Sequence, residues 1–273
     1  MIHDDKSGLE RRKFLAGLGI ATIGGVAANI MHDPVAVSAK ENVNHPSIMV
    51  FDVNGSLLDP DSMEPLFQRI FGDRLAVREW YAELALNSNS ITLSESYPAT
   101  FFELGEAVLK MMGSYRKVPI RPADIEELKT GLLTMPAFPD VPDGLRRLKQ
   151  AGFHLVTLSN SPNDPQGTQS QLENAGVAHF FEQIFSTASV RRFKCAPAVY
   201  HMVAEQLHVP TASLCMISAH HWDAFGAQSA GYSAALLNRP GHAPLPLQGL
   251  PQIQAVAPDL PAVAEQLVKL WAS

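Results

Sequence analysis

The sequence alternates short apolar runs with longer stretches that have helical periodicity. The apolar runs are typical of buried strands and lie at residues 47–53, 154–158, 181–185, 213–217 and 233–237. Helical stretches lie beside them, at residues 141–152, 196–207 and 223–231. Strands that are apolar throughout and alternate with helices pair in parallel, because a parallel pair needs a crossover connection. We therefore expect an α/β fold built on a doubly wound, mostly parallel, Rossmann-like sheet.

One long interval has no strand pattern. Residues 61–138 contain helix-like segments such as MEPLFQRIFG and TFFELGEAVLKMM, and a Pro-rich stretch, MPAFPDVP, returns the chain to the sheet. An insertion directly after the first strand predicts a cap over the carboxyl ends of the strands, where ligands bind in open α/β sheets. With 273 residues, 46% of them apolar, the chain is long enough for a core of residues 46–60 and 139–273 and a helical cap of residues 61–138.

Residues 1–39 differ in composition from the rest of the chain. Arg11 and Arg12 precede a Gly- and Ala-rich apolar run, and small residues surround Ala39. This pattern is typical of an export signal, and the arginine pair favours the twin-arginine route. Glycines make the run a poor membrane span. We expect the signal to be cleaved after Ala39 and the protein to reach the periplasm through the export machinery, without a stable membrane anchor. The alternative is a cytosolic extension with an accidental arginine pair.

The charge of the chain limits the classes of partner, and its cysteine content bears on disulfide formation. The formal net charge is −6, and no Lys/Arg cluster occurs outside the N-terminus, which argues against nucleic acid and leaves a small molecule. The only cysteines are Cys195 and Cys215, and we expect both to be free thiols because a chain of this size needs no disulfide. The Pro-rich residues 238–254 predict an extended surface segment.

Polar side chains gather at the ends of the predicted strands. Four stretches supply them: Asp52 with Ser56, Ser159 with Asn160, Lys194 with Tyr200, and Ser218 with His220 and Asp223. A carboxylate at a strand tip, in a turn with Gly55, can act as a nucleophile and form an ester. A turn aspartate without chemical function is the alternative for Asp52.

In order and spacing, these four stretches resemble the haloacid dehalogenase superfamily and, within it, the type II group of L-2-haloacid dehalogenases. The resemblance spans about residues 47–238 and includes VPDGLRRLK and the pattern SAHHWDAFGA. It implies a cofactor-independent hydrolase that cleaves the carbon–halogen bond of a short (S)-2-haloacid. Asp52 would displace the halide from the carbon next to the substrate carboxylate, with inversion, and water would then hydrolyse the aspartyl ester. A homodimer is compatible with the resemblance.

The resemblance also assigns roles to the charged residues. Lys194 would hold Asp52 ionised and offset the negative charge of the substrate. Asp223 would orient Lys194 and prepare the lytic water. Ser159 and Asn160 would hydrogen-bond the substrate carboxylate and the developing oxyanion, although Ser-Asn after a strand is also a common turn.

Other residues match the surroundings of the family site. Tyr200 and Ser218 match neighbours of the charged groups, and Ser56 keeps the hydroxyl of a family Thr. Trp222 matches a family Trp and is expected to pack rather than to take part in the chemistry. The cap aromatics Tyr81, Phe101 and Phe102 are expected in the core or the pocket wall, with Phe101 or Phe102 as the residue that would border the substrate.

The residue type at position 54 helps to distinguish a phosphatase from a dehalogenase within this superfamily. Phosphatases place a second Asp two residues after the nucleophile, where it protonates the leaving alkoxide. A halide leaves without a proton, so an amide suffices at Asn54. The stretch also lacks the acidic density expected for Mg²⁺, so no metal is expected.

Two positions depart from the family. Counting from Trp80, the Arg that receives the halide is replaced by Tyr81. Halide stabilisation would then rest on the Tyr81 hydroxyl, on Asn87 or Asn89, or on no side chain at all. Asn is replaced by His220, which can accept or donate a hydrogen bond or act as a base. A metal held with His221 is disfavoured, since neighbours on a strand point to opposite faces.

The departures leave two alternatives open. The first is a hydrolase or phosphatase of the same fold that acts on another small anion. The second is a non-catalytic protein that binds a carboxylate.

Overall fold

The computed structural model describes residues 45–162 and 167–272. The expected export signal, residues 1–39, lies outside them. A sheet of parallel strands in the order β3-β2-β1-β4-β5-β6 forms the centre of the fold. The strands are β1 (Ile48–Phe51), β2 (His154–Ser159), β3 (Gln183–Ser186), β4 (Leu214–Ser218), β5 (Ser233–Leu237) and β6 (Ala255–Ala257). The first strand is central, with β2 and β4 on either side, so the chain order reverses at β1.

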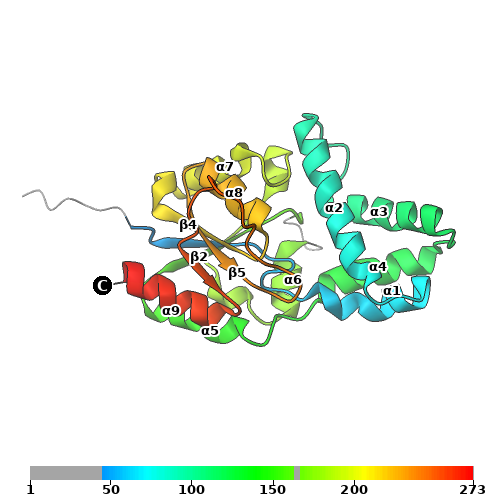
Figure 1. Ribbon diagram of the computed structural model, residues 1–273, viewed down its shortest axis with the longest axis horizontal. Coiled ribbons are helices and arrows are strands. Elements are labelled where there is room, and N and C mark those ends of the chain that lie inside the picture. The colour runs from blue at the N-terminus through cyan, green and yellow to red at the C-terminus, as the bar shows by residue number, and fades with distance from the viewer. Residues whose placement is uncertain (1–44, 163–166, 273) are drawn as a thin grey trace, which may run out of the picture. The chain divides into compact units, whose positions relative to one another are not determined.

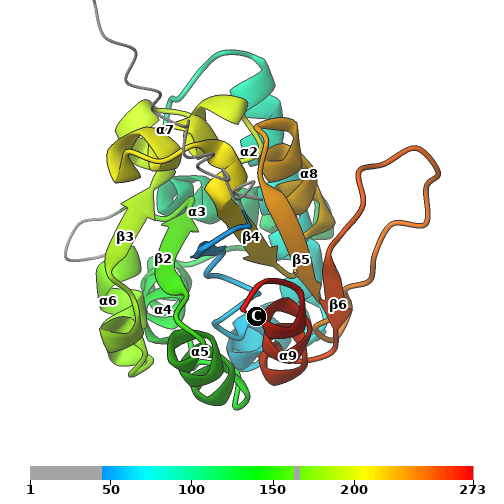
Figure 2. The same ribbon diagram turned by 90° about the vertical axis from the view of Figure 1, so that its left-hand side faces the viewer.

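Helices cover both faces of the sheet (Figure 2). On one face lie α7 (Pro197–Leu207) and α8 (His221–Ser229), and on the other α5 (Val141–Gln150), α6 (Thr168–Asn174) and α9 (Leu260–Trp271). Successive residues of β1 therefore enter different apolar clusters: Met49 and Phe51 join one, and Ile48 and Val50 the other. Burial on both faces explains why the strands are apolar throughout.

Four helices follow β1 before the chain returns to β2. They are α1 (Glu64–Phe71), α2 (Ala76–Leu93), α3 (Phe101–Arg116) and α4 (Pro122–Thr134), and Figure 1 shows them grouped beside the sheet. We call α1–α4 the cap helices. Short 3-10 helices occur at Pro60–Met63, Ala178–Phe180, Thr187–Val190 and Thr211–Ser213.

The two connections between the cap helices and the sheet lie against each other. Leu58 forms an antiparallel bridge with Ala137, and Phe138 N donates to Leu57 O at 2.9 Å. Asp59 N donates to Pro136 O, also at 2.9 Å. The segment that leaves β1 is thus fixed by backbone hydrogen bonds to the segment that enters α5.

The expected α/β fold with a parallel sheet is confirmed, and each of the five predicted strands overlaps an observed one. β6 was not predicted, because it has three residues and follows the Pro-rich segment. Cys195 and Cys215 are free thiols, as expected. Within the described ranges, no helix is both long enough and apolar enough to cross a membrane.

Candidate active site

Asp52 lies at the carboxyl end of the central strand. Its backbone N donates to Ile217 O of β4 at 3.0 Å, which extends the ladder by one residue before the chain turns. Gly55 takes a φ of +82°, and a Cβ there would stand 3.0 Å from His220 Nε2. Gly55 therefore permits both the turn and the close approach of His220.

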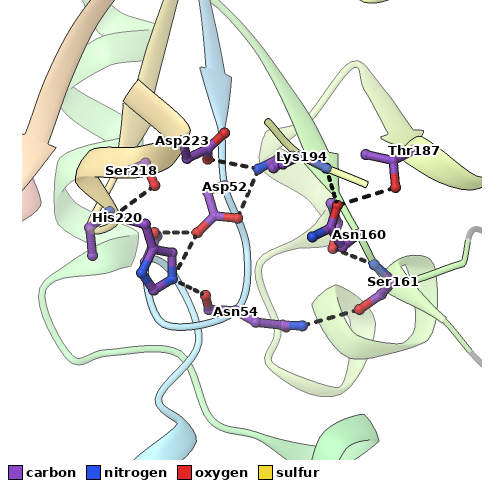
Figure 3. Close-up of polar contacts among 12 residues, drawn as sticks. Asp52, Asn54, Asn160, Ser161, Thr187, Lys194, Ser218, His220 and Asp223 are labelled. Carbon is purple, nitrogen blue, oxygen red and sulfur yellow. Dashed lines mark hydrogen bonds and ion pairs between the residues drawn. The ribbon is translucent and has the colours of Figure 1, made fainter. Parts of the chain in front are cut away.

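A lysine joins two buried carboxylates at this edge of the sheet (Figure 3). Lys194 Nζ donates to Asp52 Oδ1 at 2.9 Å and to Asp223 Oδ2 at 2.8 Å. Tyr200, on α7, donates its hydroxyl to Asp223 Oδ1 at 2.7 Å. The backbone N of Lys194 donates to Asn160 Oδ1 at 2.9 Å, so the residue after β2 places the lysine that follows β3.

The three charges shift each other's pKa. Burial raises the pKa of Asp52, but Lys194 and the hydrogen bond from Ser56 outweigh burial and bring it below the usual value. Burial lowers the pKa of Lys194, and the charges of Asp223 and Asp52 outweigh this, so it is raised overall. The pKa of Asp223 is raised by burial and by the charge of Asp52, against Lys194 and Tyr200. Asp52 is therefore the more acidic carboxylate and is ionised at neutral pH.

Serine hydroxyls fix the turns after β1 and β4. Ser56 Oγ donates to Asp52 Oδ2 at 2.5 Å and accepts from Ala219 N at 2.8 Å. Ser218 Oγ accepts from His220 N at 3.0 Å. Ser56 thus orients the carboxylate, whereas Ser218 orients the backbone that carries His220.

His220 lies beside Asp52 with its ring stacked on two aromatic rings. The centroids of Tyr81 and Trp222 lie 5.4 and 4.9 Å from that of His220, with interplanar angles of 20° and 12°. Nε2 stands 3.1 Å from Asn54 O and 3.6 Å from Asp52 Oδ2. Two acceptors around one nitrogen require Nε2 to carry its proton. Burial lowers the pKa of His220, so the ring is neutral at pH 7.

The expected geometry of the histidine pair was wrong. β4 ends at Ser218, and His220 and His221 are the N-cap and first residue of α8 rather than neighbours on a strand. His220 is buried and His221 is half-buried. Their side chains are therefore separated by the start of a helix.

Two neighbouring cavities adjoin this centre. The inner cavity is small and is lined by Asp52, Asn54, Tyr81, Ala85, Phe101, Ser159, Asn160 and Trp222. The outer cavity is larger and lies among α2, the start of α8, the segment after β1 and the segment after β5. Tyr81, Ala85 and Trp222 line both cavities and so form the wall between them.

The inner cavity has polar donors on its core side. Ser159 Oγ accepts from Ser161 N at 3.1 Å, so its hydroxyl hydrogen can be donated to a ligand. Asn160 accepts at Oδ1 from Lys194 N and Thr187 Oγ1, which leaves its amide NH₂ as a donor group. These two residues can bind a carboxylate beside Asp52.

The side chain of Asn54 hydrogen-bonds to Ser161 and Gln171 and not to the charged cluster of Asp52, Lys194 and Asp223. Its Nδ2 donates to Ser161 Oγ, and its Oδ1 accepts from Gln171 Nε2, both at 3.1 Å. Gln171 Nε2 also donates to Leu132 O of α4, at 2.8 Å. Asn54 thereby ties the turn after β1 to α6 and to the last cap helix.

Tyr81 and Phe101 lie on the cap side of the inner cavity, where the sequence placed them. The Tyr81 hydroxyl donates to Asn54 O at 2.8 Å. Asn87 and Asn89, the other residues considered for a halide, do not line the cavity: Asn87 Nδ2 donates to Glu83 O and Asn89 Oδ1 accepts from Cys195 Sγ. The expectation for these two asparagines was wrong.

Sequence reasoning missed several members of the site. Ala85 lines the inner cavity, and Arg239 binds Ser56 O through Nε and Nη2 at 3.1 and 3.0 Å. Trp222, which was expected only to pack, lines the same cavity. Arg239 follows β5 as Asp52 follows β1, so its place after a strand was the available signal. Ser161 stands in the same LSNS stretch as Ser159 and could have been found there.

Comparisons with known proteins agree with this geometry. A family model described as haloacid dehalogenase-like hydrolase matches residues 46–231. Haloacetate dehalogenase H-2 of Moraxella sp. (strain B) is 33% identical over 111 residues, which are 41% of this chain and 49% of that protein. (S)-2-haloacid dehalogenase 4A of Burkholderia cepacia is 26% identical over 226 residues, 81% of this chain and 96% of that protein.

A solved structure of an L-2-haloacid dehalogenase superimposes with a TM-score of 0.74 at 26% identity, covering 82% of this chain and 99% of that one. The match thus spans about half of the first relative and nearly all of the second and of the solved structure.

Proposed function

The chain belongs to the haloacid dehalogenase-like hydrolase family, and on this premise we propose that it hydrolyses the carbon–halogen bond of a short 2-haloacid. Where C2 is chiral, the proposed substrate is the S enantiomer. The observation that carries the proposal is the buried Asp52, held ionised by Lys194 on the wall of a cavity that has carboxylate-binding donors. The names of the relatives from Moraxella and Burkholderia support the same substrate class.

In the first step, a carboxylate oxygen of Asp52 attacks C2 of the haloacid. A C–O bond forms, the carbon–halogen bond breaks, and the halide leaves with the bonding electron pair. Ser159 and Asn160 hold the substrate carboxylate by hydrogen bonds, which fixes C2 near Asp52. Ser56 and Lys194 keep the Asp52 carboxylate in one orientation before the attack.

In the second step, water attacks the carbonyl carbon of the aspartyl ester. The bond from that carbon to the alkyl oxygen breaks, the 2-hydroxyacid leaves, and Asp52 is restored as a carboxylate. One proton from the water goes to the product oxygen and one is released. Asp223, whose pKa is raised, is the carboxylate with the greater affinity for a proton, and Lys194 connects it to Asp52.

The side chain of Asn54 supports dehalogenation over phosphate ester hydrolysis. An alkoxide leaving group needs an acid, and Asn54 has none to offer. Its amide is also committed to Ser161 and Gln171. A halide needs no proton, so an orienting amide is sufficient at this position.

The proposal is tested with the purified chain and 2-chloro- and 2-bromopropionate of both configurations. We expect halide and 2-hydroxypropionate in equal amounts from the S enantiomer, with inversion, and no product with Asp52→Asn. Asp61→Asn, which changes a carboxylate of the outer cavity, serves as the matched control and keeps activity. Halide release that persists in Asp52→Asn contradicts the proposal.

We further propose that residues 1–39 direct export by the twin-arginine route into the periplasm. The support is the pair Arg11 and Arg12 before an apolar run that ends near Ala39. Expression of the full chain and fractionation should give a shortened protein in the periplasm. Replacing both arginines by lysine should retain the full-length protein in the cytoplasm; unchanged export would refute the route.

A further inference from the structure

The cap side of the inner cavity offers no cation. Among the described residues that line this cavity, those from the cap helices are Tyr81, Ala85 and Phe101, and α8 adds Trp222. Asp52, Ser159 and Asn160 form the opposite, core side. The cap side of the cavity is therefore made of aromatic rings and a methyl group.

Two hydrogen-bond donors beside the cap side, the Tyr81 hydroxyl and His220 Nε2, are already engaged. The Tyr81 hydroxyl donates to Asn54 O at 2.8 Å, and His220 Nε2 stands 3.1 Å from the same carbonyl. A hydroxyl has one hydrogen and neutral His220 has one N–H, so neither is free for an anion while these contacts hold.

The nearest basic groups lie elsewhere. Arg78, one turn before Tyr81 on α2, lines the outer cavity and binds Asp61 through Nε and Nη2 at 3.3 and 2.7 Å. Lys194 is held by two carboxylates, Asp52 and Asp223, on the core side. Neither side chain is placed to meet an anion on the cap side.

Displacement in line with Asp52 sends the halide toward that side. Backside attack requires the leaving group to depart opposite the incoming oxygen, and Asp52 lies on the core side. A small anion such as fluoride or chloride loses strong hydration there and gains no charged donor in return. Bromide and iodide are larger and more weakly hydrated, and the positive edges of aromatic rings suit a polarisable anion.

We propose that this site selects its substrate by leaving group: it acts on 2-bromo- and 2-iodoacids, much less on 2-chloroacids and not on 2-fluoroacids. This inference rests on the proposed function. Tyr81 determines the selectivity, because its position on α2 faces the departing halide but its hydroxyl is bound to Asn54.

The test measures the single-turnover rate of ester formation on Asp52 by mass spectrometry of the intact chain. Chloroacetate and bromoacetate are compared, with the same pair reacting with acetate ion in water as the reference for intrinsic reactivity. We expect the bromide-to-chloride rate ratio of the protein to exceed the reference ratio, and fluoroacetate to form no ester.

Tyr81→Arg should accelerate chloride displacement more than bromide displacement, and so lower the bromide-to-chloride rate ratio by about tenfold. This is smaller than the rate factor of about 10²–10³ that one hydrogen-bond donor contributes at a centre where charge develops. Arg78→Gln, which removes a cation of the outer cavity, is the matched control and should leave the ratio unchanged. A wild-type ratio equal to the reference or below it overturns the inference, even if Tyr81→Arg fails to fold. Absence of an ester with every haloacid overturns the proposed function itself, so the two failures are distinguishable.

Discussion

At the scale of single residues, the site depends on one lysine shared by two carboxylates. Lys194 has 1% of its surface exposed, and Asp223 none. Charges this deeply buried are tolerated only when paired and hydrogen-bonded, and removing one partner leaves an uncompensated charge. The same pairing lowers the pKa of Asp52, the proposed nucleophile. The contacts that stabilise the buried charges therefore also keep Asp52 ionised.

Replacing Lys194 by Met tests this pairing. We expect the rate of Asp52 alkylation to fall by about 10²-fold or more, as for other charged groups at reacting centres. The pKa that governs the acid limb of kcat/KM should rise, because burial then acts on Asp52 without its main counter-charge. Lys149→Met, on an exposed position of α5, is the control. An unchanged acid limb in Lys194→Met would show that the lysine does not set the ionisation of Asp52.

The pH profile of kcat/KM follows from the same shifts. Asp52 must be ionised, and its pKa is lowered, so activity should persist at pH 5 and fall only below the usual range of an aspartate, about pH 4. Lys194 has a raised pKa, so its charge should persist to about pH 10 and above. His220 has a lowered pKa and is already neutral, so no step is expected between about pH 6 and 7. A step there would show that His220 titrates during the reaction.

The family resemblance, together with the strand order, was sufficient to find the charged residues but not their surroundings. Asp52, Lys194 and Asp223 each occur at or after a strand end, and parallel strands bring such ends together. The stacking of His220 on Tyr81 joins residues 139 positions apart and depends on how α2 lies over the sheet. No local pattern encodes that contact.

At the scale of elements, Arg239 connects the turn after β1 to the segment that enters α5. It binds Ser56 O by two hydrogen bonds and Asp140 Oδ1 at 2.7 Å, and its guanidinium lies 4.1 Å from the centre of the Phe138 ring. Ser56 in turn donates to Asp52. Arg239 therefore acts on the nucleophile through Ser56.

Arg239→Met should lower the rate of Asp52 alkylation by about tenfold, because Ser56 loses its two backbone contacts and orients Asp52 less well. KM should change little, since Arg239 does not line the inner cavity. Asp140→Asn removes the charge of the ion-pair partner but leaves Arg239 on Ser56, and should keep the alkylation rate while lowering Tm. Equal losses of rate in the two variants would assign Arg239 a purely structural role.

Element prediction succeeded where patterns were long and apolar. The runs that became β1, β2, β4 and β5 were found because burial on both faces makes them apolar throughout. The start of α8 was misjudged: His220 and His221 follow the apolar β4 run directly, and only the backbone shows where the strand ends.

At the scale of the whole chain, an α/β core supplies Asp52, the proposed nucleophile, and a helical insertion supplies part of the cavity wall. Asp52, Ser159 and Asn160 come from strand ends, whereas Tyr81, Ala85 and Phe101 come from the cap helices. The core could be predicted because its residues follow a repeated strand–helix order. The wall could be predicted only in part: Tyr81 and Phe101 were expected there, but Ala85 was not. Which faces of α2 and α3 meet the sheet depends on packing between segments far apart in sequence.

The position of Asp52 in the chemistry is tested most directly by isotope transfer. The full chain is mixed in excess over (S)-2-bromopropionate in heavy-oxygen water, for one turnover, and the peptide containing Asp52 is analysed by mass spectrometry. The mechanism predicts that one heavy oxygen enters the Asp52 carboxylate and that the released 2-hydroxypropionate contains none. Heavy oxygen found in the product, with Asp52 unlabelled, would mean that water attacks the substrate directly and would contradict the covalent mechanism.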